Sequence, residues 1–249
     1  MTITIKHHKA KFMKKFNPKV GLITLSTDQT IERDFNNICK DLPLNIFINR
    51  IHNQNPLTRE NLLKMQDELE SVTKKILPDE KINTIAYGCT SGTIAIGENN
   101  VKEKILTAKP GCYVTTPVTS AIKAFQQMSI KKIALFTPYP DAVNKTILDY
   151  FTKKNIEVLS FESLNLNLDS EIANVDPNYI LEILSKLETK DADALFISCT
   201  ALPVLNILDK LEKTKQKPVF SSNQTLIWDT IRSVGYKSPI KGYGKLLEN

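Results

Sequence analysis

Short apolar runs alternate with longer amphipathic stretches along this chain. The short runs span four to eight residues and are rich in Ile, Val, Leu and Phe, a composition typical of buried strands. The predicted strands are 20–25, 44–51, 82–87, 112–115, 132–137, 156–161, 193–198 and 217–221. The stretches between them predict helices at 30–40, 58–77, 99–107, 118–128, 141–154, 177–188, 202–213 and 223–234. This alternation predicts an α/β protein with parallel sheets flanked by helices.

The two halves of the chain repeat one pattern. Cys89 follows a strand-like run and begins the sequence Cys-Thr-Ser, and Cys199 follows another and begins Cys-Thr-Ala. Cys89 lies 63 residues after Ser26, where the first predicted strand ends, and Cys199 lies 62 residues after Thr137, at the end of a matching strand. The repeat predicts two pseudo-symmetric lobes, each a parallel sheet flanked by helices and each presenting one thiol.

A break between the lobes fits near Pro117, where the second set of strands begins. The last predicted helix can return to pack on the first lobe. We therefore expect residues 1–117 and 223–249 to form the first α/β lobe, and residues 118–222 to form the second. Two lobes of this length can each bury a hydrophobic core.

Local signals mark several boundaries. Asp141 follows two prolines and is expected to cap a helix, and Asp176 followed by Pro177 predicts another helix start. The stretch 163–175 has no clean period and is the longest predicted loop. Such a loop leaves the carboxyl end of a strand, which is where α/β proteins bind ligands.

Composition narrows the class of protein. The chain has 249 residues, with 33 Lys and Arg against 27 Asp and Glu and a formal net charge of +6. These charges are scattered, with no basic and aromatic stripe, so nucleic-acid binding is not expected. No apolar stretch is long enough to cross a bilayer, and the first residues lack the apolar core of a signal peptide. We therefore expect a cytoplasmic protein that does not bind membranes.

Cysteine and histidine usage bears on redox and metal chemistry. The four cysteines are Cys39, Cys89, Cys112 and Cys199. Their wide spacing in a chain expected in a reducing compartment predicts free thiols. The three histidines show no ligand spacing with thiols or carboxylates, so no metal is predicted. Cys39 and Cys112 most simply pack as small core residues, outside any site.

Four short motifs occur in a recognisable order. They are Tyr-Gly-Cys-Thr-Ser-Gly-Thr at 87–93, Thr-Pro-Tyr at 137–139, Ser-Cys-Thr-Ala-Leu at 198–202 and Ser-Asn-Gln at 222–224. With them the chain resembles the aspartate/glutamate racemase superfamily, roughly over residues 20–235. Within it, the chain looks most like the branch of maleate cis–trans isomerases and arylmalonate decarboxylases, and closest to the ectoine-utilisation A proteins.

The resemblance implies an active site in the cleft between the lobes and no cofactor. The two cysteines would stand on opposite sides of the substrate. In racemases of this kind one thiolate removes a proton from carbon and the other thiol supplies one to the opposite face. Maleate isomerases instead add the first cysteine to the double bond, allow rotation and eliminate. For this chain the two roles fall to Cys89 and Cys199.

Thiols suit both kinds of chemistry, because a thiolate is strongly nucleophilic and partly available near neutral pH. If Cys89 and Cys199 lie at turns from strand to helix, the backbone N–H groups that follow are expected to lower their pKa. Hydroxyls on Thr90, Ser91 and Thr200 add donors at the same turns. Such turns also form a site for a substrate carboxylate.

The resemblance assigns further residues to substrate binding. Tyr139 matches the substrate-binding tyrosine of maleate isomerases. Thr90, Ser91, Thr200 and Ala201 match the residues that flank the two cysteines. From the residues alone, Tyr139 could equally be a core-edge aromatic between two prolines.

Two positions depart from the isomerase pattern. Asp28 stands where maleate isomerases have a substrate-binding asparagine, and Asp169 aligns near a second one. A carboxylate facing a maleate carboxylate would place like charges close together, so Asp28 is expected to face an ammonium, amide or hydroxyl group. Asp28 could instead only cap the following helix, and Asp169 could be an ordinary loop residue. The segment 25–35 looks closest to the ectoine-utilisation A proteins.

The sequence thus favours a cofactor-independent, two-cysteine isomerase or epimerase that acts on a small carboxylic acid. The acid is expected to be amino- or hydroxy-substituted and linked to ectoine or hydroxyectoine breakdown. One alternative is maleate cis–trans isomerisation through a covalent adduct on Cys89. Another is a sensor that binds a small acid without transforming it, because two-lobed α/β folds also serve that purpose. A homodimer is the expected assembly.

Overall fold

The computed structural model of the chain describes residues 5–13 and 17–249. It contains two four-stranded parallel sheets, in the order β2-β1-β3-β4 and β6-β5-β7-β8. The strands are β1 (Lys19–Leu25), β2 (Asn45–Ile51), β3 (Thr84–Gly88), β4 (Tyr113–Thr115), β5 (Lys132–Thr137), β6 (Glu157–Ser163), β7 (Ala194–Ile197) and β8 (Val219–Ser221). All eight predicted strands are confirmed. The identical strand order in the two sheets confirms the predicted two-lobed α/β fold.

Helices flank both sheets. They are α1 (Ile31–Cys39), α2 (Arg59–Lys64), α3 (Gln66–Lys74), α4 (Thr90–Ile96), α5 (Glu98–Ala108), α6 (Pro117–Gln127), α7 (Asp141–Lys153), α8 (Asp169–Ala173), α9 (Pro177–Lys186), α10 (Leu208–Lys215), α11 (Ser222–Ser233) and α12 (Lys245–Glu248), with a 3₁₀ turn at Leu205–Ile207. The sequence did not predict α4, α8 and α12. The predicted helix 58–77 is divided at Met65, and the loop expected at 163–175 contains α8.

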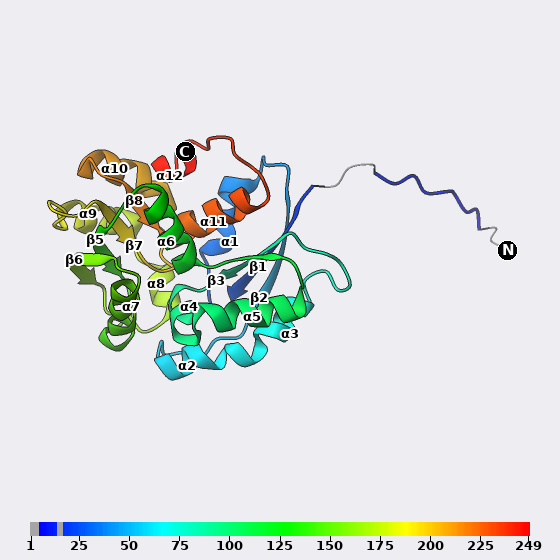
Figure 1. Cartoon of the computed structure of the whole chain (residues 1–249), viewed down its shortest axis with the longest axis horizontal. Coiled ribbons are helices and arrows are strands. Elements are labelled where there is room, and N and C mark those ends of the chain that lie inside the picture. The colour runs from blue at the N-terminus through cyan, green and yellow to red at the C-terminus, as the bar shows by residue number, and fades with distance from the viewer. Residues whose placement is uncertain (1–4, 14–16) are drawn as a thin grey trace.

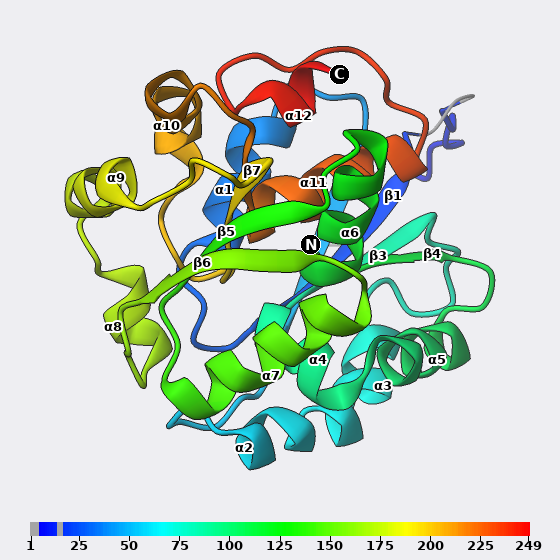
Figure 2. The same cartoon turned by 60° about the vertical axis from the view of Figure 1, so that its left-hand side comes forward.

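Helices α6 and α11 lie between the two halves of the molecule, as Figures 1 and 2 show. Helix α11 packs on α6 and contacts α1, β3 and β4 of the first half as well as β8 of the second. Residues 222–231 of this helix are all buried. A helix buried all round is typical of a protein core. The strands of the first sheet come from residues 19–115 and those of the second from 132–221, while the division at 117 and 223 stays a prediction.

Four phenylalanines anchor the second sheet. Phe125 of α6 lies with its ring centroid 5.6 Å from that of Phe196 and 5.3 Å from that of Phe220, in edge-on geometry. Phe151 of α7 lies 5.6 Å from Phe196. Edge-on pairs at this separation stabilise a core beyond the area they bury. The cluster fixes β7, the strand that leads into Cys199. Among the described residues, no helix is both long and apolar enough to cross a membrane.

Candidate active site

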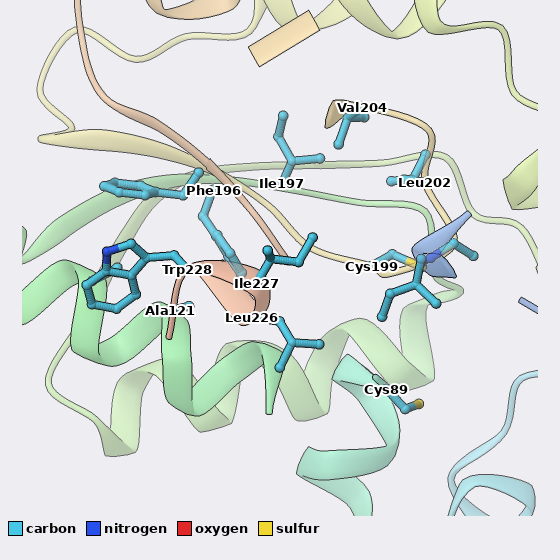
Figure 3. Packing of buried hydrophobic residues seen from close by; sticks show 14 of the residues in the cluster. Cys89, Ala121, Phe196, Ile197, Cys199, Leu202, Val204, Leu226, Ile227 and Trp228 are labelled. Carbon is cyan, nitrogen blue, oxygen red and sulfur yellow. Dashed lines mark hydrogen bonds between the residues drawn. The ribbon is translucent and has the colours of Figure 1, made fainter. Parts of the chain in front are cut away.

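The two cysteines occupy equivalent places in the two sheets. Cys89 directly follows β3, and Cys199 comes two residues after β7, the matching strand of the second sheet. Both side chains are buried, with 2% and 4% of their area exposed. Figure 3 shows both on the same side of the apolar cluster that contains Ile197 and Leu226. Ligands of open α/β sheets bind at the carboxyl ends of the strands, which is where both thiols lie.

Cys89 begins helix α4 and caps it. Its Sγ accepts a hydrogen bond from the Gly92 N–H at 3.2 Å, and the Ser91 hydroxyl lies 4.0 Å from the same sulfur. Gly92 is required here for space: a Cβ atom on it would lie 2.7 Å from Cys89 Sγ and 2.9 Å from the Tyr87 hydroxyl. The turn therefore holds the sulfur against backbone and leaves no room for a larger residue at 92.

Cys199 lies in a strained turn. Its φ of +140° falls in the region that favours glycine, and such conformations cost roughly 1–3 kcal/mol. Its Sγ accepts a hydrogen bond from the Ala201 N–H at 3.3 Å, and its own N–H donates to the Ser222 hydroxyl at 3.0 Å. The expected helix start at this turn is wrong, because the chain stays irregular until Leu205.

Hydrogen bonds join the two cysteine turns. The Thr90 hydroxyl donates to the Ser222 hydroxyl at 2.9 Å, and the Thr200 hydroxyl donates to the Gly88 carbonyl at 3.3 Å. The Thr30 hydroxyl donates to the Ala201 carbonyl at 2.8 Å. The hydroxyl groups of Thr90 and Thr200 thus donate hydrogen bonds that link the two cysteine turns. Ser222 is a site residue that the sequence did not single out, although its motif at 222–224 was visible.

Burial raises the pKa of both thiols, contrary to the lowering expected from the turns. For Cys89, burial outweighs the Gly92 and Ser91 hydrogen bonds and raises the pKa to about 12. For Cys199, burial raises the pKa well above its usual range, although the Tyr139 hydroxyl and the Ala201 N–H lower it. Burial disfavours a thiolate because a charge loses its hydration there. Both cysteines therefore rest as thiols.

A tyrosine accompanies each thiol. Tyr139 is buried, and its pKa is raised well above the usual value by burial and then by Cys199, with a smaller contribution from Cys89. Tyr139 thus acts on both sulfurs, in keeping with the hydrogen bonds that bring the two cysteine turns together. Tyr87 is also buried; burial and then Cys89 raise its pKa, while its hydroxyl donates to Met65 Sδ at 3.7 Å. The sequence did not propose Tyr87 as a site residue.

Asp28 caps a helix and also faces the thiols. Its Oδ1 accepts hydrogen bonds from the Thr30 N–H at 2.7 Å and the Ile31 N–H at 2.9 Å, at the start of α1. This confirms the capping alternative. Only 2% of its area is exposed, and burial raises the pKa of its carboxyl group. Its charge also raises the pKa of both thiols, and its turn contacts that of Cys199 through the hydrogen bond from Thr30 to the Ala201 carbonyl.

Asp169 comes from the other half of the protein. It opens helix α8, and its Oδ2 accepts hydrogen bonds from the Thr27 hydroxyl at 2.5 Å and the Asn53 amide at 3.0 Å. Burial raises the pKa of this carboxyl group, and the charge of Asp169 raises the pKa of the Cys89 and Cys199 thiols. The structure therefore brings Asp169 to the cysteines. Asn53 was missed, because nothing local in the sequence distinguishes it from other loop asparagines.

Asn223 lies near the start of the last long helix but does not cap it. Ser221 caps α11, and the Asn223 amide donates at 2.8 Å to both the Thr200 carbonyl and Asp34 Oδ2. Burial raises the pKa of Asp34 to about 7. This pair holds the turn that carries Cys199. Asp141 likewise begins α7 without capping it, whereas Asp176 caps α9 as predicted.

Two features of the described residues lie apart from this site. A surface hollow between Lys74, Pro78 and Lys109 sits at the loops that enter β3 and β4, at the opposite ends of the strands from the cysteines. Within residues 5–13 and 17–249, no group of three or more His, Cys, Asp or Glu side chains converges as metal ligands do. The site itself offers two thiols, two carboxyl groups and two phenols for chemistry.

Comparison with known proteins shows which families this chain resembles. The family model described as arylmalonate decarboxylase matches residues 66–247. A maleate isomerase of Geobacillus stearothermophilus is 26% identical over 243 residues, which cover 92% of this chain and 96% of that relative. Similar folds include the maleate isomerase Iso from Pseudomonas putida S16, at 22% identity and a TM-score of 0.85, covering 93% of this chain and 98% of that one.

A further solved structure is a cysteine-to-serine mutant of the Nocardia farcinica maleate cis–trans isomerase with a covalently bound succinylcysteine intermediate. It is 18% identical, with a TM-score of 0.85, and covers 93% of this chain and 98% of that one. The resemblance to the maleate isomerase and arylmalonate decarboxylase branch is thus confirmed, whereas the closeness to ectoine-utilisation proteins finds no support. The chain belongs to the arylmalonate decarboxylase family.

Proposed function

We propose that this protein is a cofactor-independent isomerase that converts a small cis-unsaturated acid of the maleate class to its trans isomer. The observation that carries the proposal is the convergence of the Cys89 and Cys199 turns. Ser222 joins them by accepting hydrogen bonds from the Cys199 N–H and from the Thr90 hydroxyl. Relatives along most of the chain are maleate isomerases. Maleate cis–trans isomerisation is one of the two alternatives that the sequence left open. The relatives give no support to the favoured link with ectoine-derived acids.

The proposed reaction uses only side chains of the chain. The Cys89 thiol gives its proton to a carboxylate of the site, Asp28 or Asp169, and its sulfur adds to one alkene carbon while the π electrons move to the neighbouring carbon. The Cys199 thiol gives that carbon a proton, which leaves a single bond that can rotate. The Cys199 thiolate then takes a proton back, the double bond reforms and the S–C bond breaks. The carboxyl group returns its proton to Cys89 when this S–C bond breaks. The solved succinylcysteine adduct of a relative supports a covalent intermediate of this kind.

Each residue of the site has a role in this reaction. The Gly92 N–H stabilises the Cys89 thiolate, and the Ala201 N–H and the Tyr139 hydroxyl stabilise that of Cys199. Burial keeps both sulfurs as thiols until the substrate is in place, which limits side reactions with water and oxidants. Ser222 and Thr90 hold the two turns in register.

Proton NMR in deuterated water tests the proposal. The protein is incubated with maleate and with its monoamide, and the vinyl signals are followed. The expected result is a trans product from at least one of them, lost in both Cys89→Ala and Cys199→Ala. Cys39→Ala is the matched control, because Cys39 is also buried but lies away from the site. Failure to isomerise either compound would overturn the proposal.

A further inference from the structure

Two carboxyl groups, one from each half of the protein, lie at one end of the site. Asp28 has 2% of its area exposed and Asp169 has 3%. Thr27, the residue before Asp28, donates to Asp169 Oδ2 at 2.5 Å. Thr30 of the same turn donates at 2.8 Å to the Ala201 carbonyl, in the second cysteine turn. The charges of both acids also act on the two thiols. The carboxyl groups and the sulfurs therefore share one small region. A substrate bound to the thiols would contact these acids.

One oxygen of this pair has no hydrogen-bond partner. Asp28 Oδ1 is occupied by the N–H groups at the start of α1, but among the described residues nothing donates to its buried Oδ2. The Thr200 hydroxyl is close enough to lower the pKa of Asp28, yet it donates its proton to the Gly88 carbonyl. A buried acceptor without a donor is costly, and such atoms call for a ligand group.

No cation among the described residues balances the pair. The Arg50 side chain donates to the main-chain carbonyl of Asp28, and its ion pair is with Glu32. Asp169 receives hydrogen bonds only from neutral groups, the Thr27 hydroxyl and the Asn53 amide. The end of the site is thus rich in carboxyl oxygens that no cation in the described part of the chain balances. Burial raises the pKa of both acids, so a second carboxylate placed there would either meet like charge or require one of the acids to take up a proton.

We propose that Asp28 and Asp169 select a substrate that carries a hydrogen-bond donor, an amide or an ammonium group, in place of the second carboxylate of maleate. The monoamide of maleic acid has this chemistry. Its NH₂ group can donate to Asp28 Oδ2, which lacks a donor within the described residues. This inference rests on the proposed function, since it names the substrate class of the same site.

Turnover and binding test the inference together. Wild-type kcat/KM for the monoamide is expected to exceed that for maleate roughly tenfold or more, because a site built around a donor rejects an analogue that lacks it. Asp28→Asn keeps an oxygen to cap α1 and gives the site an NH₂ donor, so it should shift the preference toward maleate. Asp169→Asn should act in the same direction. Asp176→Asn, which alters a helix cap on the exposed surface, is the control and should leave the preference unchanged.

Binding of unreactive analogues separates the two proposals. Titration calorimetry of Cys89→Ser with succinate and with the monoamide of succinic acid needs no turnover. Tighter binding of the monoamide than of succinate, reversed by Asp28→Asn, supports the inference. This holds even if neither unsaturated acid is isomerised, because that result would contradict only the proposed reaction. Equal or tighter binding of succinate, together with faster turnover of maleate, would overturn the inference and leave the isomerase intact.

Discussion

The Ser222 hydroxyl accepts a hydrogen bond from the Cys199 N–H at 3.0 Å, and so fixes a cysteine whose φ is +140°. The same oxygen accepts from the Thr90 hydroxyl at 2.9 Å, next to Cys89. A single side chain on α11 thereby joins the two turns that carry the thiols. The strain at Cys199 is held by this contact, because an unsupported turn would relax toward an ordinary φ.

Ser222→Ala is expected to lower kcat roughly tenfold or more, because it frees both turns and small displacements of reacting groups are costly. It should also lower the free energy of unfolding by about 1–3 kcal/mol, since a buried N–H loses its acceptor. Steady-state kinetics and urea unfolding measure the two effects. Ser233→Ala, at the far end of the same helix, is the matched control and should leave kcat unchanged.

Gly92→Ala is expected to abolish most activity while the fold is kept. The added Cβ would lie 2.7 Å from the Cys89 sulfur and must push it out of place. A loss of roughly 100-fold in kcat/KM follows from a displacement of this kind. Gly111→Ala is the control for backbone strain without a steric contact. Gly111 has a φ of +78° and open space around it, so this variant should lose roughly 1–2 kcal/mol of stability and no activity. Equal activities of the two variants would contradict this reading of Gly92.

The raised thiol pKa predicts how Cys89 reacts with iodoacetamide. Because its pKa is about 12, the alkylation rate should keep rising with pH up to pH 10, without the plateau near pH 8.5 of an ordinary thiol. Asp169→Asn should speed alkylation at fixed pH, since the charge of Asp169 raises that pKa. Peptide mass spectrometry resolves the cysteines. Cys39 is the internal control, because its raised pKa has burial as its cause and no contribution from Asp169.

The raised pKa of Asp34 predicts that the free energy of unfolding falls as pH rises. Its folded pKa of about 7 lies above the usual value of 3.8, so between these values the unfolded chain ionises first and the free energy of unfolding decreases. The decrease should be on the order of 2–4 kcal/mol. Urea unfolding at pH 5 and pH 7.5 should therefore show a larger drop for the wild type than for Asp34→Asn. Asp193→Asn should leave the drop unchanged, because the pKa of Asp193 is lowered by the backbone N–H of Lys131 and this group is already ionised in both states at pH 5.

Much of this architecture could be predicted because it depends on local pattern. The cysteines follow equivalent parallel strands, as the repeat predicted, and parallel strands place such residues at one edge. Helix α4 was not predicted, because Thr90–Ile96 holds glycine and β-branched residues of low helix propensity. It forms because Cys89 caps it and burial stabilises it.

The network around the carboxyl groups could not be predicted, because its members are distant in sequence. Asn53 and its partner Asp169 are 116 residues apart, and Ser222 lies 132 residues from Thr90. The direction of the pKa shift of the two thiols also depends on tertiary structure. The turns supply the expected N–H donors, but closure of the two halves over the cysteines buries the sulfurs and reverses the direction of the shift.

The covalent step on Cys89 is the central claim, and mass spectrometry of Cys199→Ser tests it most directly. Serine keeps a hydroxyl in place, but it is a poor base for removing the proton from carbon, so the adduct should accumulate. After incubation with maleate or its monoamide, a covalent mechanism predicts a mass increase equal to one substrate molecule, located on Cys89 by peptide mapping. An unmodified Cys89, together with isomerisation that survives Cys89→Ala, would contradict it.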